Sequence, residues 1–387
     1  EPILVIYRVY NGSSSGSANV TNSQIRLGDW FDSKQDILDE PKEFKFEIPN
    51  FRIVNQDSGI EYNYIQRAID NATEGDVILL GIGTFYENVV VDKRLTLLGS
   101  GDAVSIISVK ESSGMGSPPL ADSLIAGIVI VADDVSIGSL QVSNFSIGVN
   151  VSNSDDVSIS NVKIIDTTSE GIKITQSNDV VVTVAHIESS GGIGLHVGMS
   201  SPNFEITNSH IVDSGSQGML ISSSNAFVTG VTFSENSGYG LDIDSSGTSA
   251  FIADNVFTGS EGLVCYGDGN QVINNLFDNS DSVKEVGIVL QEGCSNNIFD
   301  SNKFDNVDDA YIFYSTEEAQ TDNNLIINNS HFVDVDSHLS VLGLGTGNKF
   351  INNEISKVHN PNGVDFDFSN IIELEMLTVN GPANDAE

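Results

Sequence analysis

Hydrophobic and polar positions alternate along most of this chain in a pattern that recurs about every 22 residues. Two of the repeats read IKITQSNDVVVTVAHIESSGGIG (172–194) and LDIDSSGTSAFIADNVFTGSEG (241–262). Each repeat begins with two apolar residues spaced by two. A polar turn and a second alternating stretch follow, and then comes a third apolar position. Alternation with a period of two predicts short β-strands, each with one buried face.

Residues with special backbone or hydrogen-bonding properties stand at fixed places in the repeat. A small or polar residue lies three positions before the third apolar residue of most repeats, with Val184 as the exception. This column consists of Asn161, Asn208, Gly230, Asp254, Asn274, Ser301, Asn329 and Asn352. Glycine closes most repeats, at Gly148, Gly171, Gly194, Gly218, Gly240, Gly262 and Gly287. We expect the asparagine-rich column to form a side-chain ladder at a recurrent turn, and the closing glycines to adopt positive φ.

A single repeat of three short strands is too small to enclose a hydrophobic core. Stacked repeats can do so, because they place like residues about 4.8 Å apart and bury a continuous core. Leucine-rich repeats are the main alternative, but these repeats lack a recurring Leu/Asn consensus and a helical segment. The pattern therefore predicts an all-β fold, a right-handed parallel β-helix of about 11 to 12 coils with three short strands per coil.

The ends of such a solenoid need protection, because an uncovered end exposes core residues and a sheet edge. Residues 64–73 (YIQRAIDNAT) have helical spacing, which predicts a short amphipathic helix that caps the first coil. Residues 2–10 (PILVIYRVY) alternate like a strand, and a Gly/Ser/Asn tether follows them. We expect four parts: a strand and flexible tether at 1–24, an extension wrapping the first coils at 25–63, the β-helix at 64–381, and an acidic tail at 382–387.

The segment IQRAIDNATEGDVILLGIGTFYENVVVDKRLTLLGSG (65–101) resembles the opening of proteins of the pectin-lyase-like β-helix superfamily. Pectin methylesterases and the NosD-type surface and periplasmic proteins share this opening, and later runs such as NQVINNLF and NNLIINNSHF are similar to NosD-type coils. The resemblance extends to about residue 370 and implies a right-handed parallel β-helix. It says little about function, because the superfamily mixes lyases, hydrolases, esterases, epimerases and proteins that are not enzymes.

The catalytic motifs that this resemblance would imply are absent from the sequence. Neither the methylesterase GxxDFIFG, nor the galacturonase Gly-His-Gly and Arg-Ile-Lys, nor the Asp-Pro-His of alginate epimerases occurs. The arginines are Arg8, Arg26, Arg52, Arg67 and Arg94. Uronate-processing members typically use an arginine on the β-helix, and arginine recognises a carboxylate better than lysine does. The absence of arginine after Arg94 favours a protein without enzymatic activity.

The chain is strongly acidic. It has 387 residues, of which 54 are acidic and 16 basic, for a net charge of −38. Nucleic acid is excluded as a partner, because phosphate binding needs clustered lysine and arginine. No apolar stretch approaches the ~20 residues of a membrane span, so we expect no membrane insertion. Glycosylation sequons, which are compatible with an extracellular or cell-surface glycoprotein, occur at Asn11, Asn19, Asn71, Asn144, Asn150 and Asn328.

Stacking turns each outward position into a row along the solenoid axis. One outward row contains Lys173, His196 and Asp242, and Asp244 lies in the next row on the same face. A base, an acid and carboxylates on one face are weak candidates for the catalytic groups of a lyase or hydrolase. The alternative is a solvated polar face on a very acidic protein.

A second outward row contains Lys163, His186 and His210. Two stacked histidines could share a metal ion, but no third ligand is evident. Oxygen-rich turns could also hold Ca²⁺. The acidic turns are at 133–134, 155–156, 308–309, 334/336 and 365/367. We expect no required cofactor and regard Ca²⁺ as an optional ligand.

Val264, Val289 and Ile312 are consecutive in an outward row, and Tyr266 and Tyr314 flank them. A contiguous exposed apolar strip usually has a cover, which would be a loop of the same chain or a strand of another subunit. The N-terminal strand is the candidate from another subunit, because strand addition is a route to association. Its apolar residues on one face are Ile3, Val5, Tyr7 and Val9.

The two cysteines, Cys265 and Cys294, lie in adjacent coils. Cys265 is expected to point into the core, whereas Cys294 lies at a turn and is displaced by about four positions. A bridge between stacked coils would need equal phase, so the spacing disfavours a disulfide.

Three functional hypotheses remain. The first is a structural extracellular or cell-surface protein that self-assembles into a layer, sheath or filament, partly through its N-terminal strand. The second is a protein that binds or processes extracellular polysaccharides with the face around Lys173, His196, Asp242 and Asp244. The third is a viral tail or adhesin domain, which would be trimeric. The missing catalytic motifs and the N-terminal strand favour the first.

Overall fold

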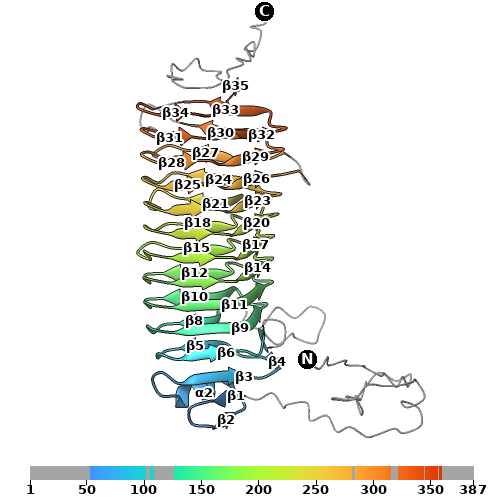
Figure 1. The fold of residues 1–387 in the computed structure, drawn as a ribbon. Coiled ribbons are helices and arrows are strands. Elements are labelled where there is room, and N and C mark those ends of the chain that lie inside the picture. Colours follow the sequence, from blue (N-terminus) through green and yellow to red (C-terminus); the bar gives the residue numbers. More distant parts are fainter. Residues whose placement is uncertain are drawn as a thin grey trace, which may run out of the picture. The chain divides into compact units, whose positions relative to one another are not determined.

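The computed structural model of the chain describes residues 53–101, 105–108, 126–280, 284–314, 321–343, 345–355 and 357–359. All of them belong to one compact unit, Phe51–Glu387. In this unit the chain winds into β-coils that stack along one axis, with α2 at one end and β35 at the other (Figure 1). The all-β parallel β-helix predicted from the repeats is confirmed.

The first wall of the solenoid is a 12-stranded parallel sheet to which each coil contributes one strand. Its strands are β5 (Val89–Val91), β8 (Ala126–Ile130), β10 (Ile147–Ser152), β12 (Ile172–Thr175), β15 (Leu195–Val197), β18 (Met219–Ile221), β21 (Tyr239–Ile243), β24 (Glu261–Cys265), β27 (Ile288–Leu290), β30 (Asp309–Phe313), β33 (Ser337–Val341) and β35 (Val358–His359).

The second and third walls, together with the N-terminal strands β1 (Ile53–Asn55) and β2 (Glu61–Tyr62), form one 23-stranded sheet, because β9 (Ser136–Ser143) and β11 (Ser158–Ile165) are long enough to run through both walls. The second wall adds β3 (Val77–Leu80), β6 (Thr96–Leu98), β13 (Val181–Thr183), β16 (Glu205–Thr207), β19 (Phe227–Thr229), β22 (Phe251–Ala253), β25 (Gln271–Ile273), β28 (Ile298–Asp300), β31 (Leu325–Ile327) and β34 (Lys349–Ile351). The third wall adds β4 (Gly83–Phe85), β7 (Ser105–Ser108), β14 (His186–Glu188), β17 (His210–Val212), β20 (Thr232–Ser234), β23 (Val256–Thr258), β26 (Leu276–Asp278), β29 (Lys303–Asp305) and β32 (His331–Val333).

The N-terminal end is closed by the short helix α2 (Ile65–Asn71), as predicted, and by an antiparallel pair, β1 (Ile53–Asn55) and β2 (Glu61–Tyr62). The Glu87 carboxylate accepts hydrogen bonds from the first two helical N–H groups, those of Ile65 (2.9 Å) and Gln66 (3.1 Å). The Gln66 amide pairs with the backbone of Val90, accepting from its N–H (2.7 Å) and donating to its C=O (3.1 Å). Gln66 therefore covers backbone groups at the edge strand β5.

The closing glycines do not have positive φ, and that prediction is wrong. They are glycine because neighbouring coils approach too closely for a side chain. A Cβ on Gly171 would lie 2.5 Å from the carbonyl oxygen of Gly194, and one on Gly218 would lie 2.6 Å from that of Gly240. The column thus lets the backbones of successive coils pass in close contact at the start of the first wall.

Positive φ occurs instead in the asparagine-rich column, where even Val184 has φ 53°. This column forms an exposed ladder, as in the hydrogen bond from Asn352 Nδ2 to Asn328 Oδ1 (2.8 Å). Asn328, with φ 58°, takes the place predicted for Asn329, because this coil has one extra residue before Phe332, which pairs with Phe304.

A second, buried ladder lies one residue further along the chain, where the sequence analysis did not place one. Its members are Asn255, Asn275, Asn302, Asn329 and Asn353. Each backbone N–H donates to the side-chain oxygen of the next member, as from Asn275 to Asn302 (3.0 Å) and from Asn302 to Asn329 (2.8 Å). The ladder satisfies buried backbone groups at the corner between the second and third walls.

The core changes in character along the axis. On the third wall the inward position is Ile164, Ile187 and Ile211 in successive coils and then becomes phenylalanine. The stack comprises Phe233, Phe257, Phe277, Phe304 and Phe332, with neighbouring ring centroids 4.6–5.5 Å apart and interplanar angles of 5–12°. In-register stacking forces like side chains into contact, so aromatic rings lie face to face.

Several predicted features lie outside the described residues. These are the strand and tether at 1–24, most of the extension at 25–63, the acidic tail at 382–387, the sequons at Asn11 and Asn19, and the acidic residues at 365/367. Of the extension, residues 53–63 are described, and β1 pairs antiparallel with β3 of the first coil. Within the described ranges, no helix has the length and apolar character needed to span a membrane.

Candidate functional site

The outward surface of the first wall carries a polar row that combines several of the predicted residues. In register, Lys173 pairs with His196, His196 with Leu220, and Leu220 with Asp242. We call Lys173, His196, Leu220 and Asp242 the polar row; Leu220 is its one apolar member. Asp244 follows directly after β21, two residues beyond Asp242 on the same side of the strand. The structure therefore brings the four sequence candidates onto one face, with Leu220 between His196 and Asp242.

Glu170, which the sequence analysis missed, anchors one end of the polar row. Its carboxylate lies 2.7 Å from the Lys173 ammonium and accepts a hydrogen bond from the Ser169 hydroxyl (2.5 Å). Burial opposes its ionisation, but the hydrogen bonds from Lys173 and Ser169 outweigh burial and lower the pKa of Glu170. The sequence feature that could have identified Glu170 is its position directly before the closing Gly171, where the chain turns into the first wall.

His196 lies next to this ion pair, with Nδ1 4.0 Å from the Glu170 carboxylate. Burial, and then the charge of Lys173, lower the pKa of His196 despite the opposing carboxylates of Glu170 and Asp244. Its imidazole is therefore neutral at pH 7. Nδ1 is shielded from solvent and has no hydrogen-bond partner within the described part of the chain.

Asp242 is the second half-buried member of the row. Burial and the nearby Asp244 carboxylate raise its pKa, and a hydrogen bond from Gln217 Nε2 to Oδ2 (3.1 Å) opposes this rise only in part. Its other oxygen, Oδ1, is shielded from solvent without a partner in the described residues. Asp244 is better satisfied, since it accepts hydrogen bonds from the Ser222 hydroxyl and from the Ser246 N–H (2.6 Å).

Two tyrosines border Asp242. Burial, followed by the charges of Glu261, Tyr266 and Asp242, raises the pKa of Tyr239 to about 12. Burial and the Asp242 charge also raise the pKa of Tyr266. Both phenols therefore stay protonated at neutral pH and can donate hydrogen bonds. The face thus presents a neutral imidazole, carboxylates and aromatic hydroxyls.

The exposed apolar strip that we predicted further along this face does not exist. The register from Val264 to Val289 to Ile312 is as expected. However, Val264 is 1% and Val289 4% exposed, and Ile312 is half-buried. Outward phase alone therefore does not decide exposure, because other groups on the same wall can cover a short valine. The assembly role of these residues stays a prediction, and of them Tyr314 is exposed.

A cavity of about 450 Å³ lies at the C-terminal end of the same wall. Its lining residues are Asp308, Asp309, Asp336, Ser337, Ser340, Lys357, Val358 and His359. Burial, then the charges of Asp336 and Asp309, raise the pKa of Asp308. The acidic turns are evident in the sequence, but their proximity to Lys357 and His359 appears only in the structure.

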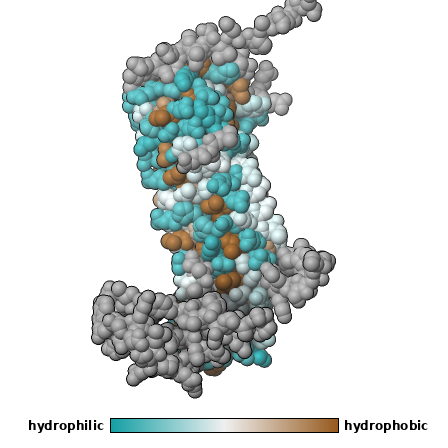
Figure 2. Space-filling view, turned by 90° about the vertical axis from the view of Figure 1, so that its right-hand side faces the viewer, coloured by the Kyte–Doolittle hydropathy of each residue, from teal (hydrophilic) through white to brown (hydrophobic). Residues whose placement is uncertain are grey.

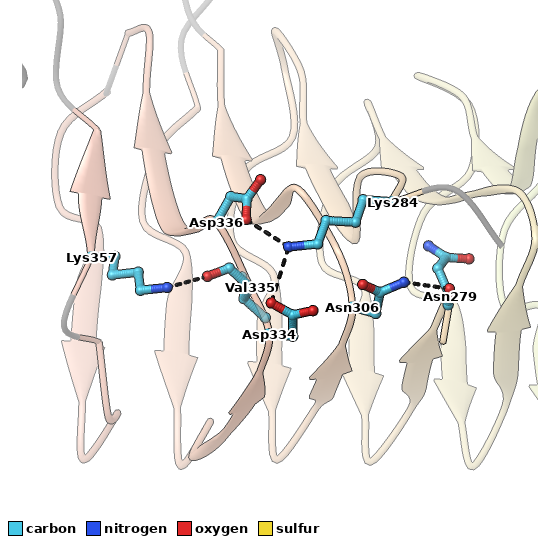
Figure 3. Close-up of polar contacts among 7 residues, drawn as sticks. All are labelled: Asn279, Lys284, Asn306, Asp334, Val335, Asp336 and Lys357. Atoms are coloured by element: carbon cyan, nitrogen blue, oxygen red, sulfur yellow. Dashed lines mark hydrogen bonds and ion pairs between the residues drawn. The ribbon is translucent and has the colours of Figure 1, made fainter. Parts of the chain in front are cut away.

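Lysine contacts hold the turns beside this cavity (Figure 3). The Lys284 ammonium points between Asp334 (3.3 Å) and Asp336 (2.6 Å), which lie about 50 residues further along the chain. Lys357 Nζ donates to the carbonyl oxygen of Val335 (2.5 Å). These contacts neutralise part of the acidic turn that the sequence suggested for Ca²⁺. No group of three or more His, Cys, Asp or Glu side chains in the described ranges could hold a metal ion.

The second predicted row, Lys163, His186 and His210, also lies in register. The two imidazole centroids are 6.1 Å apart, and His186 Nε2 lies 3.0 Å from Glu188, which also pairs with Lys163 at 3.2 Å. These contacts, a hydrogen bond from His186 and an ion pair from Lys163, form a surface network on the third wall. The hydrophobic residues on the face of the solenoid seen in Figure 2 are likewise scattered among hydrophilic ones.

The described sequons differ in accessibility. Asn71 and Asn144 are exposed, whereas Asn150 and Asn328 are half-buried. Asn328 is also engaged in the outer ladder, because its Nδ2 donates to Asp300 (3.0 Å). Glycosylation at these positions stays a prediction, and Asn71 and Asn144 are the more accessible acceptors.

A family model described as "Right handed beta helix region" matches residues 126–277 and 222–378. No curated protein sequence matches the chain significantly. Among solved structures, the Azotobacter vinelandii mannuronan C-5 epimerase AlgE6 A-module is similar with a TM-score of 0.54 at 13% identity, over 75% of this chain and 93% of that one.

Two further structures show the same fold in other settings. The Yersinia enterocolitica family 28 exopolygalacturonase has a TM-score of 0.53 at 13% identity, over 84% of this chain and 77% of that one. PfbA, a surface adhesin of Streptococcus pneumoniae, has a TM-score of 0.53 at 14% identity, over 77% of this chain and 87% of that one. At such identities the likeness concerns the fold alone.

Proposed function

The chain belongs to the right-handed β-helix region family, and we propose that it is an extracellular or cell-surface protein that binds a polysaccharide along the outward face of its first wall. The observation that carries the proposal is the pair of solvent-shielded, partnerless atoms on this face, His196 Nδ1 and Asp242 Oδ1. Buried polar atoms normally have partners. After a side-chain rotation that exposes each atom, a ligand hydroxyl would supply the missing hydrogen bond.

The geometry of the row suits an extended chain of sugars. Coils repeat every ~4.8 Å, so a glycan parallel to the axis would meet one outward side chain per coil. His196 and Asp242 lie on either side of Leu220, an apolar surface against which a sugar ring can pack. Tyr239 and Tyr266 add phenolic donors beside Asp242. Structures with this fold include, by their names, a mannuronan epimerase and an exopolygalacturonase.

The charges of the face favour a neutral or amino-sugar glycan over a polyuronate. The lysine of the polar row, Lys173, is already paired with Glu170, and the sequence contains no arginine after Arg94. The carboxylates of Asp242 and Asp244 and the net charge of −38 would repel a polyanion.

Hydrolysis is the second candidate function, and the environment of Asp242 favours it. A half-buried carboxyl with a raised pKa is the usual form of a general acid in glycoside hydrolysis. Release of reducing ends from a bound glycan, abolished in Asp242→Asn, would identify the protein as a hydrolase. Self-association through Ile3, Val5, Tyr7 and Val9 stays a separate prediction.

Binding to immobilised neutral, amino-sugar and uronate polysaccharides tests the proposal. We expect His196→Ala and Asp242→Asn each to weaken binding of the preferred glycan roughly tenfold, the loss of one buried hydrogen bond. The matched controls are His210→Ala and Asp305→Asn on the third wall, which should bind like the wild type. If the controls lose as much affinity as the first-wall variants, or if no variant changes it, the proposed face is wrong.

A further inference from the structure

The only two cysteines of the chain meet inside the solenoid. Cys265 is the last residue of β24 and Cys294 lies in the turn after β27, and both side chains are fully buried. Burial, and then the neighbouring Cys265 thiol, raise the pKa of Cys294. The same small region holds Asn297, whose Nδ2 lies 3.1 Å from Cys294 Sγ, and Gly267, whose carbonyl accepts from the Cys265 thiol (3.3 Å).

This contact contradicts the expectation that the two residues differ too much in phase. Cys265 pairs in register with Leu290, and Asn270 stacks on Asn297. Asn270 follows Cys265 by five positions, whereas Asn297 follows Leu290 by seven. The turn of the second coil is thus longer, and its extra length carries Cys294 back over Cys265.

Each cysteine occupies a position at which the neighbouring coils have another residue type. Cys265 stands between Ile243 and Leu290 on the inward side of the first wall. Cys294 takes a turn position that is Gly267 in the coil before and Thr321 in the coil after. The equivalence follows from a third asparagine ladder, formed by Asn270, Asn297, Asn324 and Asn348 at the corner between the first and second walls. The carbonyls of these turn residues accept in turn from the side chains of Asn297 (3.1 Å), Asn324 (2.8 Å) and Asn348 (2.6 Å). The two departures occur in adjacent coils, and both sulfurs lie beside the hydrogen bond from Asn297 to Gly267.

We propose that Cys265 and Cys294 form an intramolecular disulfide when the chain folds in the presence of a small-molecule disulfide. In the first step, one cysteine thiolate attacks a sulfur of that molecule, forms a mixed disulfide and expels one thiolate. The second cysteine thiolate then attacks the protein sulfur of the mixed disulfide and expels the other. The protons of the two cysteines end on the two released thiols, so two protein thiols are oxidised and one external disulfide is reduced.

The surrounding hydrogen bonds tolerate this change. Oxidation removes the thiol hydrogen that Cys265 donates to Gly267, but that carbonyl also accepts from Asn297 Nδ2 (3.1 Å) and stays satisfied. The Asn297 amide can still donate to Cys294, because a disulfide sulfur remains a weak acceptor. Exchange must precede closure of the coils or follow their local opening, since both sulfurs are buried.

Refolding the full chain in a buffer of oxidised and reduced glutathione tests the proposal. We expect peptide mapping without reductant to recover Cys265 and Cys294 in one cross-linked peptide, with no thiol alkylated in denaturant. The bridge closes a loop of about 30 residues and should raise Tm by roughly 5 °C over the reduced protein. Cys265→Val and Cys294→Ser, which follow the residue types of their columns, should show a Tm that does not respond to reductant.

The proposal is overturned if the chain refolds to its native circular dichroism spectrum in this buffer and both thiols remain open to alkylation in denaturant. A wild-type Tm that is equal with and without reductant would also overturn it. Should either variant fail to fold, the mapping of the wild-type protein decides alone.

Discussion

The coils of residues 126–230 and those of residues 231–355 build the same solenoid with different interiors. In the first region the third wall is aliphatic, as at Ile187, and the corner between the first and second walls is held by a serine ladder. There Ser154 N–H donates to Ser177 Oγ (3.1 Å), and Ser177 Oγ donates to the carbonyl of Thr175 in its own coil (2.9 Å). The second region has stacked phenylalanines and asparagine ladders instead.

The two ladders differ in how far they reach. A serine hydroxyl links two coils, because its own donor returns to a carbonyl two residues away. An asparagine side chain links three. Asn275 Nδ2 donates to the carbonyl of Ile252 (3.0 Å) in the coil before and to Asn302 Oδ1 (3.1 Å) in the coil after. The second region is therefore more tightly cross-linked between coils, which allows its turns to vary in length.

The largest difference in free energy of unfolding between the two regions is expected at the phenylalanine stack. Phe277 is buried between Phe257 (4.6 Å) and Phe304 (5.1 Å), so Phe277→Ala removes two ring contacts and leaves a cavity. We expect a loss of about 3–5 kcal/mol in the free energy of unfolding, measured by denaturant titration. Ile187→Val at the equivalent position of the first region should cost only about 1 kcal/mol. Equal losses would mean that the stack adds nothing beyond aliphatic packing.

The next effect concerns the ladders. Asn302→Ala leaves the buried N–H of Asn275 without its acceptor and the carbonyl of Val272 without its donor, and we expect a loss of about 3 kcal/mol. Ser177→Ala, which orphans only the N–H of Ser154, should cost about 1 kcal/mol. Denaturant titration of both variants measures the difference. A serine variant as damaging as the asparagine variant would contradict the longer reach assigned to asparagine.

The smallest effect is a pH dependence confined to the second region. His338 is buried and stacked on Phe332, and burial lowers its pKa to about 4. The unfolded chain, with a histidine pKa of about 6.5, binds this proton first, so stability present above pH 6.5 is lost as pH falls towards 4. With solvent screening, we expect about 2 kcal/mol.

His338→Gln should remove this part of the acid sensitivity in denaturant titrations at pH 7 and pH 4.5. His210→Gln, at an exposed histidine of the first region, is the matched control and should leave the slope unchanged. The role assigned to His338 would be contradicted if the wild type lost no more free energy of unfolding between pH 7 and pH 4.5 than His338→Gln does.

The repeat pattern alone was sufficient to predict the register between coils. Apolar pairs such as Ile172 and Ile174 set the phase of every coil, and the registry of Lys173 with His196 follows from it. Side-chain exposure was less predictable, because it depends on the size of neighbours in other coils. Val264 faces outward as predicted, yet it is buried. Glu170 was missed because it lies outside the strict alternation, at the bend before β12.

What the sequence by itself determined is the solenoid: period-two alternation, closing glycines and turn asparagines allow only stacked parallel coils. The tertiary structure decided everything that depends on distances between coils. Close backbone approach, rather than positive φ, explains Gly171. A turn longer by two residues brings Cys294 to Cys265. Burial leaves His196 and Asp242 each with one atom that has no hydrogen-bond partner among the described residues. These features arise between coils, where turn length and side-chain volume act together and no single repeat records the result.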